Sequence, residues 1–201
     1  MFKRAIILIF LILLSLSCEN TQIYSVKEES KDFYLKNGSN IASDAFLHLS
    51  GNLKKEIEKS SFADAISFCN VNGESILKQS QSNEYIEIKR VSDRNRNPNN
   101  LANQQELEII ENYKKAIKTG GNSNPLLIAT KHDVIFYSPI KTMPFCLNCH
   151  GDNNKEIAEN TKVKLKELYP NDKAISYKAN DLRGLWKIVF KNQEKNIKVS
   201  N

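Results

Sequence analysis

The sequence lacks the patterns that mark several common classes of protein. It contains no second Cys-x-x-Cys pair and no His-x-x-x-His pair, so the paired ligand clusters of a structural zinc site are missing. It shows no Ser-His-Asp set, no paired carboxylates and no phosphate-binding loop, and we therefore do not expect an enzyme. A kinase or methyl-accepting segment is also missing, so we expect any signal to pass to a separate protein partner.

The charge balance and the length narrow the function further. The 201 residues carry 29 Lys and Arg against 23 Asp and Glu, which gives a formal net charge of +6. This excess is small and spread along the chain, so no nucleic-acid partner is expected. The length suits one domain with a hydrophobic core, and neither an internal repeat nor a linker interrupts residues 41–192.

Long apolar runs are missing too, apart from one short segment near the N-terminus. Residues 5–16 are almost all Ile, Leu and Phe, and they follow the basic pair Lys3-Arg4. They are too few for a membrane span, which needs about 20 residues. A basic start, a short apolar core and small residues after it are typical of a signal peptide. We therefore predict a signal peptide over residues 1–17 and an exported protein.

Cys18 follows small residues at the end of this segment. It resembles the lipid-acceptor cysteine of bacterial lipoproteins, although Ser15 stands where leucine is usual. We predict that Cys18 carries the lipid and that the polar residues 18–40 tether the domain to the membrane. The protein would then be a lipoprotein on the periplasmic face or in the cell envelope. The alternative is a plain secretory signal with an unrelated cysteine.

The most informative stretch is Cys146-Leu147-Asn148-Cys149-His150-Gly151. Two cysteines three positions apart lie on one side of a helical turn, so their thiols can add to the two vinyl groups of one porphyrin. The histidine that follows is carried to the ring centre, where its imidazole can bind iron. We predict one covalent haem c, attached through Cys146 and Cys149 with His150 as an axial ligand. Bacterial c-type haem is attached outside the cytoplasm, which agrees with the predicted export.

A thiol-disulfide oxidoreductase is the main alternative, because these proteins also carry Cys-x-x-Cys at a helix start. Their motif normally lies early in the domain, whereas only about fifty residues follow Cys149 here. Phe145 also stands where a tryptophan is expected before the first cysteine. The haem interpretation is therefore favoured, and the dithiol interpretation stays open.

The hydrophobic periodicity predicts an α+β fold. Apolar residues at helical spacing predict a helix over 41–57 and a second helix that begins at Ser61, with Asp64 as its entry partner. Asn103 with Glu106 predicts another helix start. The other predicted elements are a strand over 85–92, a hairpin of 126–130 and 134–140, a helix over 155–168, a strand over 185–190 and a polar tail over 193–201. Together they predict a single domain with an antiparallel sheet flanked by helices, preceded by an N-terminal helical segment.

The chain has four cysteines, and Cys69 is the one that these assignments leave over. It lies on the apolar face of the second predicted helix, where a free cysteine is most often a small buried hydrophobic residue. It is also a candidate for the second axial ligand of the iron. From the residues alone the usual partner is methionine or histidine, and the candidates are then Met143, His132 and His48. Met143 is close to the motif and His132 lies in a hairpin turn, which leaves His48 as the main alternative.

Four segments resemble a family of exported c-haem domains with a PAS-like fold, long catalogued as a domain of unknown function. One is the helix segment that ends at Cys69, and another is the haem motif. The most specific is Arg90-Val91-Ser92 followed by Arg96-Asn97-Pro98-Asn99 and Glu106. The last comprises Tyr169-Pro170, Asp172, Tyr177 and Asp181-Leu182-Arg183-Gly184. The resemblance covers roughly residues 41–190.

This resemblance implies a single PAS-like domain whose haem iron is held by His150 on one side and by Cys69 on the other. A thiolate ligand donates charge to the iron and lowers its reduction potential relative to methionine. Such a haem suits a sensor of redox state or of a small ligand, and PAS-like folds are commonly sensor modules. The alternative function is a low-potential electron-transfer cytochrome, and either one implies a redox or signalling partner.

Three arginines lie in the segments that carry the resemblance outside the haem motif. A haem has two propionate carboxylates, which need charge-assisted donors when they are partly buried. Arg90, Arg96 and Arg183 are the candidate donors. The alternative is that these arginines hold loops in place through backbone carbonyl groups.

Overall fold

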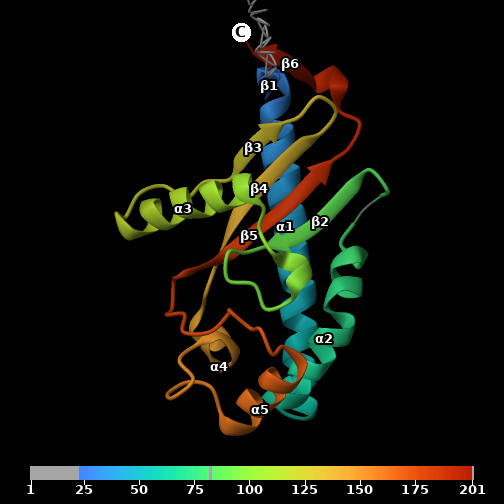
Figure 1. The fold of residues 1–201 in the computed structure, drawn as a ribbon. Coiled ribbons are helices and arrows are strands. Elements are labelled where there is room, and N and C mark those ends of the chain that lie inside the picture. Colours follow the sequence, from blue (N-terminus) through green and yellow to red (C-terminus); the bar gives the residue numbers. More distant parts are fainter. Residues whose placement is uncertain (1–22, 82, 201) are drawn as a thin grey trace, which may run out of the picture.

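A computed structural model describes residues 23–81 and 83–200, and its centre is a four-stranded antiparallel sheet with the order β2-β5-β4-β3. The strands are β2 (Ile86–Val91), β3 (Leu126–Ala129), β4 (Val134–Lys141) and β5 (Leu182–Phe190). Strands β3 and β4 form the predicted hairpin. Helices cover both faces of the sheet, so the predicted α+β class is confirmed (Figure 1).

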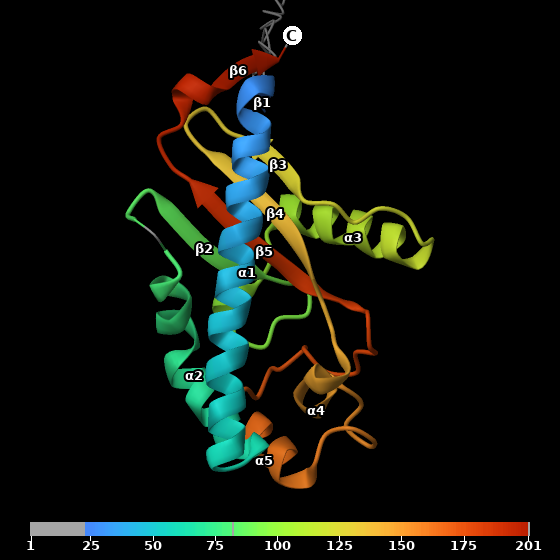
Figure 2. The same ribbon diagram turned by 180° about the vertical axis from the view of Figure 1, so that it is seen from behind.

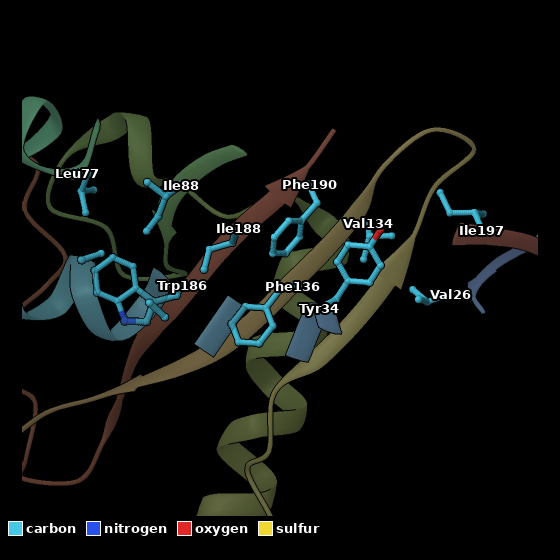
Figure 3. Packing of buried hydrophobic residues seen from close by; sticks show 12 residues of the cluster. Val26, Tyr34, Leu77, Ile88, Val134, Phe136, Trp186, Ile188, Phe190 and Ile197 are labelled. Atoms are coloured by element: carbon cyan, nitrogen blue, oxygen red, sulfur yellow. The ribbon is translucent and has the colours of Figure 1, made fainter. Parts of the chain in front are cut away.

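The alternation of side chains along the strands divides the core into two layers. Phe136 of β4 lies opposite Ile188 of β5 in the register, and both are completely buried on one face. Neighbouring residues in the same strands, such as Tyr137 and Leu185, belong to the cluster on the other face. Successive side chains of a strand point to opposite faces, so two central strands can serve two layers. Figure 3 shows the first layer, in which Trp186 also takes part.

Helix α1 (Glu28–Lys59) crosses the first face of the sheet, as Figure 2 shows. Its backbone approaches the sheet closely at Gly38, where an added Cβ would collide with the ring of Phe136. The chain then turns at Ser60 and returns along α1 as helix α2 (Phe62–Gln79). The predicted helix entry is confirmed, because the Ser61 side chain accepts a hydrogen bond from the Asp64 backbone N–H at 3.1 Å.

Helix α3 (Gln104–Lys118) packs on the second face. Asn103 and Glu106 form the predicted capping box. Glu106 is buried because its carboxylate also accepts hydrogen bonds from Lys187 at 2.7 Å and from Tyr137 at 3.2 Å. The cap therefore fixes the start of α3 to strands β4 and β5.

The predicted polar tether is wrong for residues 23–40. Ile23–Val26 forms strand β1, and α1 begins at Glu28. The predicted polar tail is also wrong for residues 193–200, because the short helix η3 (Glu194–Asn196) and strand β6 (Ile197–Ser200) are formed there. Strands β1 and β6 pair with each other, and Val26, Tyr34 and Ile197 complete the core, so both ends of the described chain belong to the domain.

The segment between β4 and β5 forms the opposite end of the molecule from β1 and β6 (Figure 1). It contains the short helices η2 (Pro144–Cys146) and α4 (Leu147–His150), then α5 (Glu159–Leu168). Helix α5 begins four residues later than predicted, because the backbone N–H groups of Lys155, Glu156 and Ile157 all donate to the carbonyl of Asp152 in a tight turn. Within the described residues, no helix is long and apolar enough to cross a membrane.

Candidate functional site

The cysteine motif and Cys69 come together at this end of the molecule. Cys146 ends η2, Cys149 and His150 lie on α4, and Cys69 lies on α2. Helix α2 packs on α5, where Ile66 joins Ile157 and Leu165 in a small apolar cluster. Cys149 packs against this cluster, and Ile66 lies one helical turn before Cys69 on α2. The fold thereby brings Cys69 to a pair of cysteines that lies about eighty positions further along the sequence.

The imidazole of His150 is held in one orientation. Its Nδ1 atom hydrogen bonds to the carbonyl oxygen of Ala174 at 2.7 Å, so Nε2 is the nitrogen that remains to bind a metal. Burial and the charges of Arg96 and Arg183 lower the pKa of His150 well below its ordinary value. A neutral imidazole is the form that ligates iron, and a carbonyl acceptor on the other nitrogen makes it a stronger donor.

The thiols lie in a partly buried, electropositive environment. Burial raises the pKa of Cys69, while Arg90 and Arg96 lower it. Burial also raises the pKa of Cys149 to about 11, against the effect of Arg96 and together with the charges of Cys69 and Cys146. The net effect is a pKa of Cys69 above its ordinary value, and the two arginines offset part of the cost of forming the thiolate, which is the form that binds iron.

Arg96 makes its contacts to the protein itself. Its Nε donates to Asp172 Oδ2 at 2.9 Å, and its Nη2 donates to the carbonyl oxygens of Cys149 at 2.5 Å and Ala174 at 3.3 Å. The geometry therefore favours the alternative in which this arginine holds a loop through backbone carbonyls. The propionate interpretation of Arg96 finds no support in these contacts.

Arg90 and Arg183 differ from Arg96, because each has a buried Nε without a hydrogen-bond partner in the described chain. Arg183 uses Nη1 to reach Ser92 Oγ at 3.1 Å, and burial lowers its pKa to about 10. The hydroxyl of Tyr177 is also buried without a partner there, and this residue is only 4% exposed. The Arg183 guanidinium lies 5.4 Å from the centre of the Tyr177 ring.

A buried donor without an acceptor costs about 1–3 kcal/mol, so three of them at one site indicate an acceptor group that the protein does not supply. The charges of Arg90 and Arg183 act on each other, and both help to lower the pKa of His150. Carboxylates are acceptors of the right charge. These residues therefore fit an anionic part of a bound group, as the propionates of haem would require.

The other three candidate axial ligands lie in different surroundings. His132 is in the turn between β3 and β4, at the far end of the sheet, and its ring bonds to Glu194 at 2.8 Å. His48 is exposed and bonds to Ser80, which is about 16 Å along α2 from Cys69 at 1.5 Å per residue. Met143 directly precedes η2 and is 43% exposed. Among the candidates, Cys69 is the one whose charge acts on the haem motif.

Three residues of the site have no role in the sequence analysis, namely Arg94, Ala174 and Tyr177. Tyr177 contributes to the family resemblance, and its place in the segment from Tyr169 to Gly184 is the sequence feature that points to it. Ala174 acts through its backbone, so its side chain carries no information about that role. The predicted signal peptide and the lipid site at Cys18 lie outside the described residues. Within residues 23–81 and 83–200, no group of three or more His, Cys, Asp and Glu side chains could hold a metal ion.

Comparison with known proteins identifies the family. The model of the Tll0287-like family matches residues 19–190. The fold is similar to the crystal structure of the cyanobacterial heme-protein Tll0287, with a TM-score of 0.57 and 17% sequence identity over 79% of this chain and 95% of that chain. No curated protein matches. Because the family model covers most of the sequence, including Cys69, the haem motif and all the arginines of the site, the chain belongs to the Tll0287-like family.

Proposed function

We propose that this chain is a c-type haem protein whose iron is held between an imidazole and a thiolate. Cys146 and Cys149 form the two thioether bonds, His150 is one axial ligand and Cys69 is the other. One observation carries the proposal: Cys69 of α2 lies close enough to the Cys-x-x-Cys-His motif for its charge to act on Cys149. In the same motif His150 is a neutral imidazole whose Nδ1 bonds to the carbonyl of Ala174. The heme-protein Tll0287 has a similar fold, which supports the same class of cofactor.

The surrounding residues are suited to such a group. A bound haem supplies an iron that exchanges one electron and binds small axial ligands. His150 offers Nε2, and the charges of Arg90 and Arg96 offset part of the effect by which burial raises the pKa of Cys69. Arg90, Arg183 and Tyr177 offer the unpartnered donors to the propionates. Arg96 takes no part in this contact, because its Nε and Nη2 already donate to the protein.

The biological role that we propose is sensing of redox state or of a small ligand. A thiolate ligand keeps the potential low, and an axial bond that is released on reduction would change the contacts of α2. The same site in an electron-transfer cytochrome would keep both axial ligands in both oxidation states. The exposed Met143 and the half-exposed Phe145 beside the motif support this second function, because an exposed apolar edge suits a redox partner.

The location that we propose is the outer face of a membrane, with a lipid on Cys18 as the anchor. The support is the pattern of residues 1–18, which is independent of the haem motif. Replacing Cys18 by Ser is expected to release the protein from the membrane fraction. Unchanged partitioning of the Cys18→Ser variant would instead favour an uncleaved or plain secretory signal.

Absorption and EPR spectra of the purified holoprotein in both oxidation states test the proposed function. We expect a Soret band that stays with the polypeptide after denaturation and a low-spin ferric signal with thiolate character. A protein without a Soret band would favour the thiol-disulfide oxidoreductase. Loss of one axial ligand on reduction supports the sensor, whereas six-coordinate iron in both states supports the carrier.

A further inference from the structure

Two segments far apart in the sequence are joined next to His150. One is the loop of residues 93–97 after β2, and the other is the loop of residues 172–177 before β5. Arg96 connects them with the motif, since it donates to Asp172, to Ala174 and to the carbonyl of Cys149. The side chain of Arg96 is therefore a bridge between the loop that carries Ala174 and the helix that carries His150.

Arg94 makes the same kind of contact from the same loop. Its Nε donates to the carbonyl of Lys173 at 3.2 Å, and its Nη2 donates to that of Ile175. Its guanidinium also stacks on the Tyr177 ring, 4.1 Å from the ring centre. Three consecutive carbonyls, those of residues 173, 174 and 175, thus accept hydrogen bonds from two guanidinium groups.

The middle one of these three carbonyls is the acceptor of His150 Nδ1. Backbone bonds from Tyr177 N to His150 O at 2.9 Å and from Ser176 N to Gly151 O at 2.7 Å close the same loop on the motif. The orientation of the imidazole consequently depends on a backbone atom whose own position is set by Arg94 and Arg96.

We propose that Arg94 and Arg96 are positioning residues for His150, and that they fix the imidazole before any cofactor is bound. This inference rests on the proposed function for its consequence at the iron, whereas the orientation of the ring belongs to the protein alone. The guanidinium groups hold the Ala174 carbonyl against Nδ1, so Nε2 presents its lone pair to the site. Without them only the backbone bonds of Ser176 and Tyr177 hold this loop to the motif, so the Ala174 carbonyl shifts and the ring loses its acceptor.

The consequence for the iron has a sign that separates positioning from simple electrostatics. An imidazole without a carbonyl on Nδ1 is a weaker donor, which destabilises ferric iron and raises the reduction potential. Removal of a positive charge near the iron stabilises the ferric state by itself and lowers the potential. Positioning and charge therefore predict shifts in opposite directions for the same variant.

The first experiment measures the reduction potential of the holoprotein with Arg96→Gln, Arg96→Lys and the control Lys173→Gln. Lys173 is exposed on the same loop, so Lys173→Gln removes one nearby charge and leaves the carbonyls in place. We expect the reduction potential to rise in both Arg96 variants, including Arg96→Lys, which keeps the positive charge. In the control Lys173→Gln we expect a small decrease of the potential or no change. A negative shift for Arg96→Gln with an unchanged Arg96→Lys would overturn the proposal.

The second experiment uses the full chain produced without haem attachment and labelled with nitrogen-15 in histidine alone. The chain has three histidines, so His48→Gln and His132→Gln assign the spectrum. We expect one imidazole N–H, that of His150 Nδ1, to exchange slowly in the wild type and to lose this protection in Arg96→Gln. Asp172→Asn is a second variant, because it removes the acceptor of Arg96 Nε and keeps an oxygen for the Ala174 N–H.

The two experiments distinguish a failure of the positioning role from a failure of the proposed haem function. Protection that persists in Arg96→Gln, or in Asp172→Asn if the first variant does not fold, contradicts the positioning role whatever the cofactor is. Protection that is lost as expected in a chain that never acquires a Soret band contradicts the proposed haem function and leaves the positioning of His150 by the two arginines in place.

Discussion

The Nδ1 atom of His150 lies 2.7 Å from the carbonyl oxygen of Ala174, which is 24 residues further along the chain. Helix α4 has only four residues, so it cannot by itself fix the ring that it carries. The orientation comes from a loop that packs on the helix from outside. A metal-binding histidine that is held in this way has a defined tautomer, and its free nitrogen points in one direction.

The first prediction concerns covalent attachment. In the double variant Cys146→Ala/Cys149→Ala no thiol remains to bond to the porphyrin vinyl groups, so denatured protein is expected to lose all haem stain on a gel. Each single variant retains one bond and is expected to keep part of the stain. Stain of wild-type strength in the double variant is incompatible with a c-type attachment.

The second prediction concerns Cys69 as an axial ligand. In Cys69→Ala the thiolate signature of the ferric spectrum is expected to disappear, and the reduction potential is expected to rise as the donated charge is lost. Covalent haem remains, because attachment depends on Cys146 and Cys149. Cys69→Met replaces the thiolate by a neutral thioether and is expected to raise the potential while the iron stays six-coordinate.

Val71→Ala is the matched control, since this side chain is on the same helix and is 77% exposed. Its spectrum is expected to equal that of the wild type. If Cys69→Ala also keeps the wild-type ferric spectrum, the ligand lies elsewhere and His48 is the next residue to replace.

The third prediction concerns the unpartnered donors. In Arg183→Gln a propionate loses its cation, so the pKa of this carboxyl rises towards its ordinary range and the potential becomes dependent on pH. The potential is expected to increase as the pH falls through that pKa, with a slope of at most about 59 mV per pH unit for one coupled proton. Lys89→Gln is the control, because it also removes one positive charge, but from an exposed lysine that pairs with Glu87. A variant whose potential follows that of the wild type at every pH would give Arg183 a structural role only.

The fourth prediction concerns the contact of α1 with the sheet. Gly38→Ala places a Cβ against the ring of Phe136, which is completely buried, so the helix or the ring must shift. We expect a loss of about 1–3 kcal/mol in the free energy of unfolding, measured by urea denaturation. Gly51→Ala on the same helix meets nothing within 4 Å and is expected to gain up to about 1 kcal/mol. Equal stabilities of the two variants would contradict the packing of α1 on β4.

The fifth prediction concerns stability at alkaline pH. Burial raises the pKa of Tyr113 from its ordinary value to about 12, and its hydroxyl donates to the carbonyl of Asn124 at 2.6 Å. Because the folded protein holds this proton more tightly than the unfolded chain, the stabilisation is present below pH 10 and is lost between pH 10 and 12. Tyr113→Phe cannot ionise, so its stability is expected to fall less over this interval, by at most about 3 kcal/mol. Parallel urea denaturation curves at pH 8 and pH 11.5 measure the difference, and identical losses would exclude Tyr113 as their source.

The sequence alone determined the features that depend on neighbours along the chain. Ser61 with Asp64 and Asn103 with Glu106 mark helix starts through contacts within one turn, and the strands alternate with a period of two. The proposed haem motif is equally local, because thioether attachment would require a fixed spacing within one helical turn. Residues 23–40 were misjudged for the opposite reason, since their few apolar side chains gain stability only from the core and from β6.

The tertiary structure decided which residues meet at the site. Among the residues themselves, Cys69 had no advantage over His48 or Met143 as an axial ligand, and it was the resemblance to the family that favoured it. In the structure α2 packs on α5, and this places Cys69 beside the motif. Arg96 and Arg183 both lie in segments that resemble the family, so the sequence does not distinguish them. In the structure the guanidinium of Arg96 bonds to backbone carbonyls, whereas Arg183 has a buried Nε without a partner. Ala174 acts through a carbonyl that every residue has, so its role follows from position in space and has no counterpart in the sequence.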